Sequence, residues 1–270
     1  MAGPLHIETQ GQGSDLVLLH GWGLHGGIWE SVLERLVTGF RVTRVDLPGH
    51  GLSRAKPMSG ALSEVAGEVL ASVPEQAVWL GWSLGGLIAQ RAALDAPRRL
   101  RGLILANTTP RFVTAPGWLD AMPPEQLQEF AAGLGWDYKE TLQRFLSLQV
   151  RGDEAARGAL RQLRDALFAR GEPDGASLAA GLDLLRTSDL RAELARIASP
   201  TLVIAGGYDR LTPPAASVAL AQSIPGVRLQ LIPKSAHAPF LSHPEDFIAA
   251  VTGFMQGLDG GRPARRRNLS

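Results

Sequence analysis

Short apolar runs alternate with longer segments in which apolar residues recur at helical spacing. Residues 15–20 and 100–107 are almost continuously apolar, which is typical of strands buried on both faces. The predicted strands are 5–9, 15–20, 40–46, 77–80, 100–107, 201–205 and 227–232, and the predicted helices are 28–36, 62–73, 87–94, 214–223 and 244–255. Strands that alternate with helices of this length predict an α/β fold with a mostly parallel central sheet flanked by helices.

The pattern changes between residues 110 and 185. Runs of β-branched residues disappear there, and Ala, Leu, Gln, Arg and Trp recur at helical spacing instead. We interpret 110–185 as a helical lid inserted between strands of the sheet, with 1–109 and 186–258 forming the core. Residues 259–270 are rich in Gly and Arg and are predicted to be a disordered basic tail.

Composition narrows the function classes. The 270 residues are 45% hydrophobic and 20% charged, with a net charge of +1, which argues against nucleic acid or a membrane surface as the main partner. The chain has no cysteine, which excludes thiolate catalysis and fits a cytoplasmic location. It shows no secretory leader, no apolar run near the ~20 residues of a membrane span, and no metal or phosphate motif. We expect a monomer without metal or cofactor.

One turn carries a recognisable chemical motif. The predicted strand 77–80 leads into Gly81-Trp82-Ser83-Leu84-Gly85, a G-x-S-x-G sequence, and a helical segment follows it. In a nucleophile elbow, this sharp strand-to-helix turn exposes a serine hydroxyl above the sheet. An ordinary strand–helix turn can also contain Gly and Ser, so the interpretation of Ser83 as a nucleophile depends on its partners.

A serine nucleophile needs a base, which in this arrangement follows it along the chain. Only His237 and His243 lie downstream of Ser83. His237 is in a loop just after a predicted strand, at the same edge of the sheet as Ser83. His243 precedes a proline at the start of the last helix, where a capping or surface role is the better interpretation. His237 is therefore the predicted base.

The base in turn needs a carboxylate that fixes its tautomer. Asp209 follows the predicted strand 201–205 through a short Gly-Gly-Tyr turn, so it also lies at the carboxyl edge. Asp183 and Asp189 lie in or beside the predicted lid, away from any strand end. Asp is common in turns, but that role explains neither the chain order nor the position of Asp209. We predict a Ser83–Asp209–His237 triad.

The tetrahedral intermediate requires hydrogen-bond donors for its oxyanion. One predicted donor is the N–H of Leu84, directly after the nucleophile, and the other is the N–H of Trp22, in the His20-Gly21-Trp22-Gly23 loop after an early strand. The side chain of Trp22 is expected to form a pocket wall. His20 and His50 are expected to be structural hydrogen-bonding residues.

These motifs make the chain similar to the α/β-hydrolases, and within them to the biotin-synthesis esterases that act on a carrier-bound methyl ester. The resemblance rests on the segments 16–24, 79–87, 144–149, 188–191 and 236–240. It implies that the methyl ester of pimeloyl-[acyl-carrier protein] is hydrolysed to the free pimeloyl carrier and methanol. The substrate contacts that it implies are Trp22, Ser83, Leu84, Phe145, Leu146, Ser147, Leu148, Gln149 and His237.

The lid allows two interpretations of its apolar positions. Leu142, Phe145, Leu146 and Gln149 recur at i, i+3, i+4 and i+7, so they share one helix face. This face either packs within the lid or forms the wall of a tunnel for an acyl chain, with Gln149 as its polar marker.

A second lid helix, predicted from about Asp153 as N-cap to Arg170, carries a basic stripe. Arg157, Arg161 and Arg164 are spaced to share one face. A solvated face is the usual interpretation. Together with Arg144 they would also suit the docking of an acidic acyl-carrier protein, although Glu140 weakens such a patch.

Alternative functions remain open at this level. The same triad would serve a general short-chain esterase, a thioesterase or a hydrolase of carbon–carbon bonds. A non-catalytic ligand-binding module on the same scaffold is a further alternative, which the complete set of catalytic residues disfavours.

Overall fold

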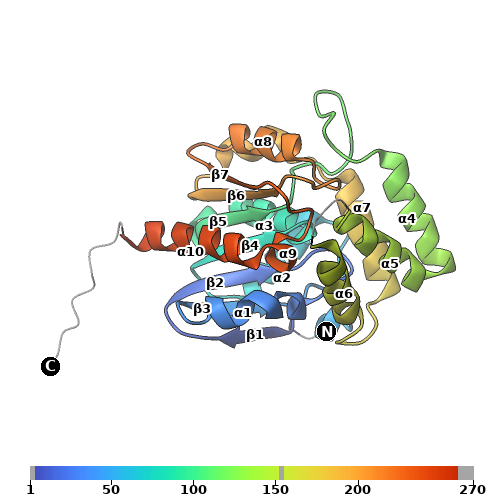
Figure 1. Ribbon diagram of the computed structural model, residues 1–270, viewed down its shortest axis with the longest axis horizontal. Coiled ribbons are helices and arrows are strands. Elements are labelled where there is room, and N and C mark those ends of the chain that lie inside the picture. The colour runs from blue at the N-terminus through green and yellow to red at the C-terminus, as the bar shows by residue number, and fades with distance from the viewer. Residues whose placement is uncertain (1–3, 152–154, 261–270) are drawn as a thin grey trace.

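The computed structural model describes residues 4–151 and 155–260, which form a layered α/β structure around a seven-stranded sheet (Figure 1). The strands lie in the order β1-β3-β2-β4-β5-β6-β7, and all neighbours are parallel except β1, which runs antiparallel to β3. Their bounds are β1 Ile7–Gln10, β2 Ser14–Leu19, β3 Phe40–Val45, β4 Ala77–Trp82, β5 Leu100–Ala106, β6 Thr201–Gly206 and β7 Arg228–Ile232. The predicted mostly parallel sheet is therefore confirmed.

Helices cover both faces of this sheet. Helix α1 packs against α10 on one face, while α2 and α3 pack together on the other (Figure 1). The bounds are α1 Glu30–Leu36, α2 Leu62–Ser72, α3 Leu84–Asp95, α8 Pro214–Ser223, α9 Pro239–Ser242 and α10 Pro244–Gly260. Short 3₁₀ turns are η1 Gly26–Trp29, η2 Gly51–Ser53, η3 Pro97–Arg99 and η4 Arg191–Arg196. Double coverage explains why the central strands are continuously apolar: every residue of β4 and β6 is buried.

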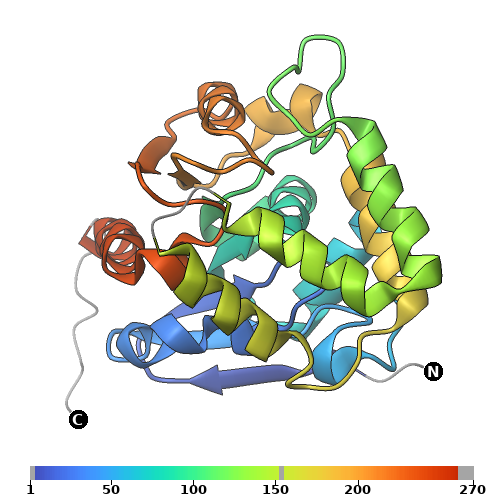
Figure 2. The ribbon, with the colours of Figure 1, turned by 45° about the vertical axis from the view of Figure 1, so that its right-hand side comes forward.

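Four helices lie between β5 and β6 and form a separate layer over one edge of the sheet (Figure 2). They are α4 Pro124–Trp136, α5 Tyr138–Gln149, α6 Ala156–Leu167 and α7 Gly175–Thr187. Residues 110–123 differ from the helical prediction: they form a loop with two isolated bridges, Val113 with Met122 and Ala115 with Trp118. We refer to α4–α7 as the lid helices.

Several element ends differ from the sequence predictions. Strand β4 continues to Trp82, and α3 begins at Leu84 rather than residue 87, because the turn between them is a single residue. Helix α10 continues to Gly260, five residues past its predicted end, and includes the first two residues of the predicted tail. The rest of that tail, 261–270, lies outside the described residues. None of the helices that the structure describes has the length and apolarity to cross a bilayer.

Candidate active site

The turn between β4 and α3 holds its serine in a strained conformation. Ser83 has φ of 55° and ψ of −119°, a region that non-glycine residues rarely occupy. The flanking glycines have no room for a side chain: a Cβ on Gly81 would lie 2.3 Å from the carbonyl oxygen of Gly85, and one on Gly85 would lie 2.5 Å from that of Leu19. These close approaches explain why the motif needs glycine on both sides of the serine.

Asp209 and His237 form a buried pair after β6 and β7. Nδ1 of His237 lies 2.8 Å from Oδ2 of Asp209, and both side chains are almost completely buried. Because an ionised carboxylate only accepts hydrogen bonds, Nδ1 carries the hydrogen of this contact. The structure therefore brings together the base and its orienting carboxylate, the two residues predicted for these roles from the sequence.

The surroundings of Asp209 favour its ionised form. Burial alone would raise the pKa of this carboxyl, but the charge of His237 and hydrogen bonds from His237, Thr212 and Asn107 outweigh it and hold the pKa below its usual value. The backbone N–H groups of Leu211 and Thr212 donate to Oδ1 at 2.8 and 3.0 Å. A fixed carboxylate of this kind can keep the imidazole of His237 in one tautomer.

The other ring nitrogen of His237 is available for chemistry. Among the described residues, Nε2 is buried and has no hydrogen-bond partner. The His237 ring lies beside the elbow, with its centroid 5.6 Å from that of Trp82, whose indole N–H donates to the His237 carbonyl at 2.7 Å. Trp82, the residue before Ser83, thus holds the backbone at His237 with its side chain. This contact was not predicted from the sequence.

The loop after β2 packs directly against the elbow. A Cβ on Gly21 would lie 3.2 Å from the Cβ of Ser83 and 3.0 Å from the Trp82 ring. This contact places the backbone around Trp22 close to the serine. Leu84 is the first residue of α3, so its N–H is one of the first-turn donors that have no acceptor within the helix. The Leu84 N–H and the loop that carries Trp22 therefore both adjoin Ser83.

Helix α5 lies over this site. The Trp22 ring contacts Phe145 edge-on at 4.9 Å between centroids, and a Cβ on Gly23 would lie 2.7 Å from Leu142. The Trp22 indole N–H donates 2.9 Å to the Leu178 carbonyl of α7. At the end of α5, the Gln149 carbonyl accepts the His237 N–H at 2.9 Å. The lid helices are thus joined to the loops that carry both the predicted oxyanion donor and the predicted base.

The predicted substrate segment on α5 divides between two faces. Phe145, Leu146 and Gln149 are buried, Leu148 is half-buried, and Ser147 is exposed. The Ser147 hydroxyl donates 2.8 Å to the Gln143 carbonyl of its own helix, so the structure does not place it with the buried group. A helical period of 3.6 residues accounts for this division, because five consecutive residues span more than a full turn and cannot all lie on one face. The amide oxygen of Gln149 is buried without a partner in the described residues.

Three further histidines surround the loop after β2, and all of them have both ring nitrogens in hydrogen bonds. His20 accepts the Leu47 N–H at 2.9 Å, and His50 accepts the Gly23 N–H at 3.2 Å. Their Nδ1 atoms lie 2.8 Å from carbonyl oxygens of Gly21 and Pro48. These contacts agree with the structural roles expected of His20 and His50.

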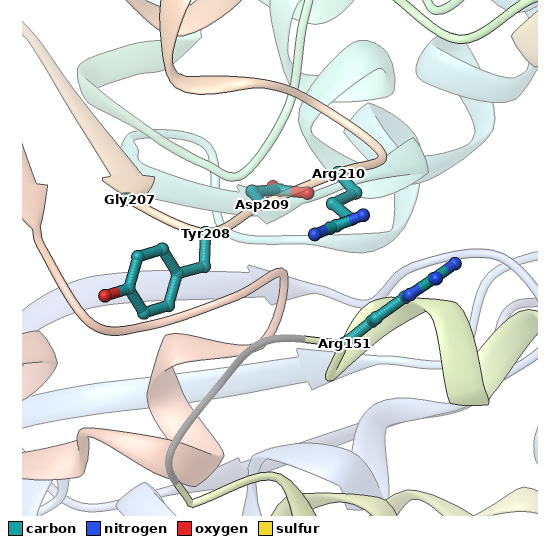
Figure 3. A pocket seen from close by; sticks show the side chains of 5 residues that line it. All are labelled: Arg151, Gly207, Tyr208, Asp209 and Arg210. Carbon is teal, nitrogen blue, oxygen red and sulfur yellow. The ribbon is translucent and has the colours of Figure 1, made fainter.

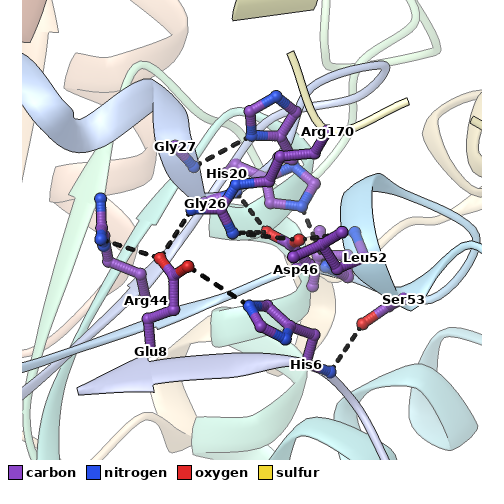
Figure 4. Close-up of polar contacts among 12 residues, drawn as sticks. His6, Glu8, His20, Gly26, Gly27, Arg44, Asp46, Leu52, Ser53 and Arg170 are labelled. Carbon is purple, nitrogen blue, oxygen red and sulfur yellow. Dashed lines mark hydrogen bonds and ion pairs between the residues drawn. The ribbon is translucent and has the colours of Figure 1, made fainter. Parts of the chain in front are cut away.

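His25 and Asp46 complete this group and were not found from the sequence; Figure 4 shows Asp46 with its polar contacts. His25 Nε2 lies 2.6 Å from the Ala166 carbonyl of α6, and its Nδ1 accepts the Gly27 N–H at 3.0 Å. The buried Asp46 carboxylate accepts the N–H groups of Gly26 and Leu52 and faces the Arg170 guanidinium at 3.2 Å. We call His20, His25, His50 and Asp46 the loop-supporting cluster.

The lid arginines lie where the helical pattern predicted. Arg157, Arg161 and Arg164 are exposed on α6, while Leu163 and Leu167 on the same helix are buried. Arg144 is exposed on α5. Residues 152–154, which include the Asp153 that the sequence suggested as the start of this helix, lie outside the described residues.

A pocket of about 380 Å³ opens beside residues 207–213, the loop after β6 that carries Asp209 and that we call the acid loop (Figure 3). It is lined by Arg151 at the end of α5 and by Gly207, Tyr208, Asp209 and Arg210 after β6. Arg151 and Arg210 extend toward the space between the lid helices and the acid loop. The described residues that line this pocket therefore include two arginines beside the Asp209 carboxylate.

The other residues considered for the carboxylate and the base of the triad lie elsewhere. Asp183 forms a surface ion pair with Arg186 of its own helix, and Asp189 pairs with Arg191 and Arg111. His243 follows α9, and its carbonyl accepts the Phe247 N–H at the start of α10. None of these groups reaches the His237–Asp209 pair in the hydrogen bonds of the described residues.

Comparisons with known proteins agree with this architecture. An esterase named pimeloyl-[acyl-carrier protein] methyl ester esterase from Xanthomonas oryzae pv. oryzae is 46% identical over 94% of this chain and 100% of its own length. A Nitrosomonas europaea protein of the same name is 44% identical over 91% of this chain and 97% of its own.

Solved structures are similar as well. A hydrolase from Pseudomonas aeruginosa has a TM-score of 0.79 at 33% identity, covering 93% of this chain and 94% of its own. An esterase from Exiguobacterium antarcticum has a TM-score of 0.83 at 25% identity, covering 93% and 95%. The sequence profile of the alpha/beta hydrolase fold matches residues 16–244. This chain belongs to the alpha/beta hydrolase family.

Proposed function

We propose that this protein is a serine carboxylesterase that hydrolyses the methyl ester of pimeloyl-[acyl-carrier protein]. The observation that carries the proposal is the buried Asp209–His237 pair beside the strained serine turn, in which the histidine Nε2 has no hydrogen-bond partner among the described residues. The names of the Xanthomonas and Nitrosomonas relatives supply the substrate. The protein is a carboxylic ester hydrolase, and the substrate places it in biotin synthesis.

The proposed reaction has two halves. Nε2 of His237 takes the proton of the Ser83 hydroxyl as Oγ attacks the ester carbonyl, and the N–H groups of Leu84 and Trp22 stabilise the oxyanion. The imidazolium then protonates the leaving methoxide, so methanol departs and an acyl-enzyme remains. Water attacks that ester with His237 again as base, and collapse of the second intermediate returns the proton to Ser83 and releases the carboxylate.

The lid helices support an extended acyl substrate. Phe145 packs edge-on against both Trp22 and Phe130, at 4.9 and 5.3 Å between centroids, and Leu146 on the same helix is buried. An apolar wall suits the methylene chain of a pimeloyl group. The buried amide oxygen of Gln149 can accept a hydrogen bond from a polar group of the substrate arm.

The exposed arginines of α5 and α6 support an acidic carrier. Arg144, Arg157, Arg161 and Arg164 have no ion-pair partner among the described residues. A surface of one sign accelerates association with a partner of opposite sign and contributes little to binding of a small neutral ester. The proposal also includes a monomeric, cytoplasmic enzyme.

The first test compares methyl pimeloyl-carrier protein with p-nitrophenyl butyrate as substrates of the wild-type enzyme and of Ser83→Ala. We expect a higher kcat/KM for the carrier-bound ester, and for Ser83→Ala a loss of about 10⁴-fold or more on both substrates with an unchanged circular dichroism spectrum. Ser72→Ala, on α2, is the matched control and should retain full activity. Retained activity in Ser83→Ala would contradict the mechanism, and equal rates for all esters would favour a general esterase.

A second test reverses the charge of Arg157, Arg161 and Arg164 together. We expect kcat/KM for the carrier-bound ester to fall about tenfold or more, mainly through KM, while p-nitrophenyl butyrate hydrolysis stays unchanged. A triple reversal of Arg35, Arg98 and Arg196 changes the net charge equally at the opposite edge of the sheet, because these residues precede β3, β5 and β6. Since Arg35 and Arg196 are ion-paired with Glu245 and Glu193, the melting temperature of this control is measured as well. Equal losses in both triple variants would remove the docking surface from the proposal.

A further inference from the structure

Asn107 occupies an unusual position between the loops that carry the acid and the base. It directly follows β5, the strand between β4 with the serine turn and β6 with the acid loop. Its side chain is completely buried, and its φ of 44° lies in the left-handed region. Asparagine tolerates that conformation better than other residues with a Cβ, so a side chain is kept where glycine would be easiest.

Both hydrogens of the Asn107 amide are used. Nδ2 donates to Oδ2 of Asp209 at 2.8 Å and to the carbonyl of Ala236 at 3.1 Å. Because both partners are acceptors only, the amide nitrogen and not the oxygen has to face them. One side chain thus connects the Asp209 carboxylate to the residue directly before His237.

The contacts at Oδ2 of Asp209 show why this matters. This oxygen accepts three hydrogen bonds, from His237 Nδ1, from Asn107 Nδ2 and from the Thr212 hydroxyl at 2.5 Å. Asn107 and Thr212 therefore disperse the same negative charge that His237 faces. Loss of either donor would leave more of that charge on the histidine contact.

We propose that Asn107 is a positioning residue for the esterase activity proposed above, holding the Asp209 carboxylate and the His237 loop in one arrangement. Its side-chain hydrogen bonds among the described residues go to Asp209 and Ala236 and not to Ser83. Without its donor, the carboxylate is a stronger acceptor, and the Asp209–His237 pair keeps its proton to higher pH. The other ionisable groups around this carboxylate, Arg151, Tyr208 and Arg210, line the neighbouring pocket and stay the same in each variant.

The test uses two donor-removing variants and one control. Asn107→Gly removes the side-chain amide and keeps a residue that accepts positive φ. Thr212→Val removes the second donor to Asp209 Oδ2 and replaces the threonine side chain by one of nearly the same shape. Thr201→Val is the matched control, because this buried threonine on β6 donates to the Ser199 carbonyl instead. It should lose stability without changing the Asp209–His237 pair.

The readout is the pH profile of kcat/KM for p-nitrophenyl butyrate, with melting temperature measured in parallel. In Asn107→Gly we expect the acid limb to move up by about half to one pH unit and kcat/KM at pH 7 to fall about tenfold. Thr212→Val should move the limb in the same direction, and Thr201→Val should not move it. A lower melting temperature with an unmoved acid limb in Asn107→Gly would overturn the proposal.

A second measurement separates this proposal from the proposed function. The ¹⁵N NMR signals of the His237 ring, assigned by comparison with His237→Gln, report the protonation of the pair in the resting protein without substrate. The titration midpoint should rise in Asn107→Gly even if no ester tested is hydrolysed. An absence of esterase activity in wild type would contradict the proposed function, while an unchanged midpoint would contradict the role of Asn107.

Discussion

The buried histidines close to the serine turn are of two kinds, His237 and the histidines of the loop-supporting cluster, and the two kinds differ in their hydrogen bonds. His237 has one ring nitrogen on the Asp209 carboxylate and the other without a partner in the described residues. His20 has both nitrogens occupied, one by the Gly21 carbonyl and one by the Leu47 N–H. Both rings are completely buried. The difference lies in their hydrogen bonds rather than in their depth.

That difference distinguishes a histidine that can act as a base from histidines that stabilise a loop. A histidine with a free nitrogen and a fixed carboxylate can accept a proton, since the resulting charge is compensated. At His20 protonation would set a donor against the Leu47 N–H, and burial together with the nearby His50 lowers its pKa from about 6.5 to about 3. Such a histidine stays neutral and fixes the backbone of the loop that carries Trp22.

The largest expected contrast is between Asp209, the partner of His237, and Asp46, the carboxylate of the loop-supporting cluster. Asp209→Asn should lower kcat by about 10⁴-fold, because the amide cannot keep His237 in the correct tautomer. Asp46→Asn should reduce activity far less and instead lower the free energy of unfolding by about 1–3 kcal/mol, since it weakens a contact with Arg170 and two backbone N–H groups. Turnover of p-nitrophenyl butyrate and urea unfolding of both variants measure the contrast. Comparable activity losses would mean that the loop-supporting cluster takes part in catalysis.

The sequence predicted the positions of the chemical groups better than their environment. The elbow, Asp209 and His237 each follow a strand of the sheet, and parallel strands bring their carboxyl ends to one edge, so proximity of these residues could be inferred. Asn107 follows a strand in the same way and could have been found by the same argument. Thr212 carried only the weak signal of a threonine three residues after Asp209.

The contacts of the lid could not be predicted. That Gln149 holds the His237 N–H with its carbonyl depends on how α5 crosses the sheet edge, which no local pattern encodes. Arg170 reaches Asp46 and Glu8 across more than a hundred residues of chain. Such contacts follow from tertiary packing, whereas helix and strand patterns report only which face of an element is apolar.

The last contrast concerns pH and tests the neutrality of the loop-supporting cluster. Burial lowers the pKa of His20, His25 and His50 in the folded protein, so below pH 6.5 the unfolded chain binds more protons. Stability is therefore complete above about pH 6.5 and falls as the pH decreases, by up to about 1.4 kcal/mol per pH unit for each such histidine. The carboxyl groups of Asp46 and Asp209, whose pKa values are also lowered, add to this loss only below about pH 4.

Urea unfolding between pH 7 and pH 4.5 isolates the histidines from the carboxylates. His50→Gln keeps an acceptor for the Gly23 N–H but removes one titrating group, so the decline of stability with falling pH should be less steep than in wild type, whatever the stability at pH 7. An equal slope in both proteins would show that the pKa of His50 is not lowered in the folded state, so that it becomes protonated there as in the unfolded chain. His50 would then belong with the histidines that carry charge, and the distinction between the two groups would fail.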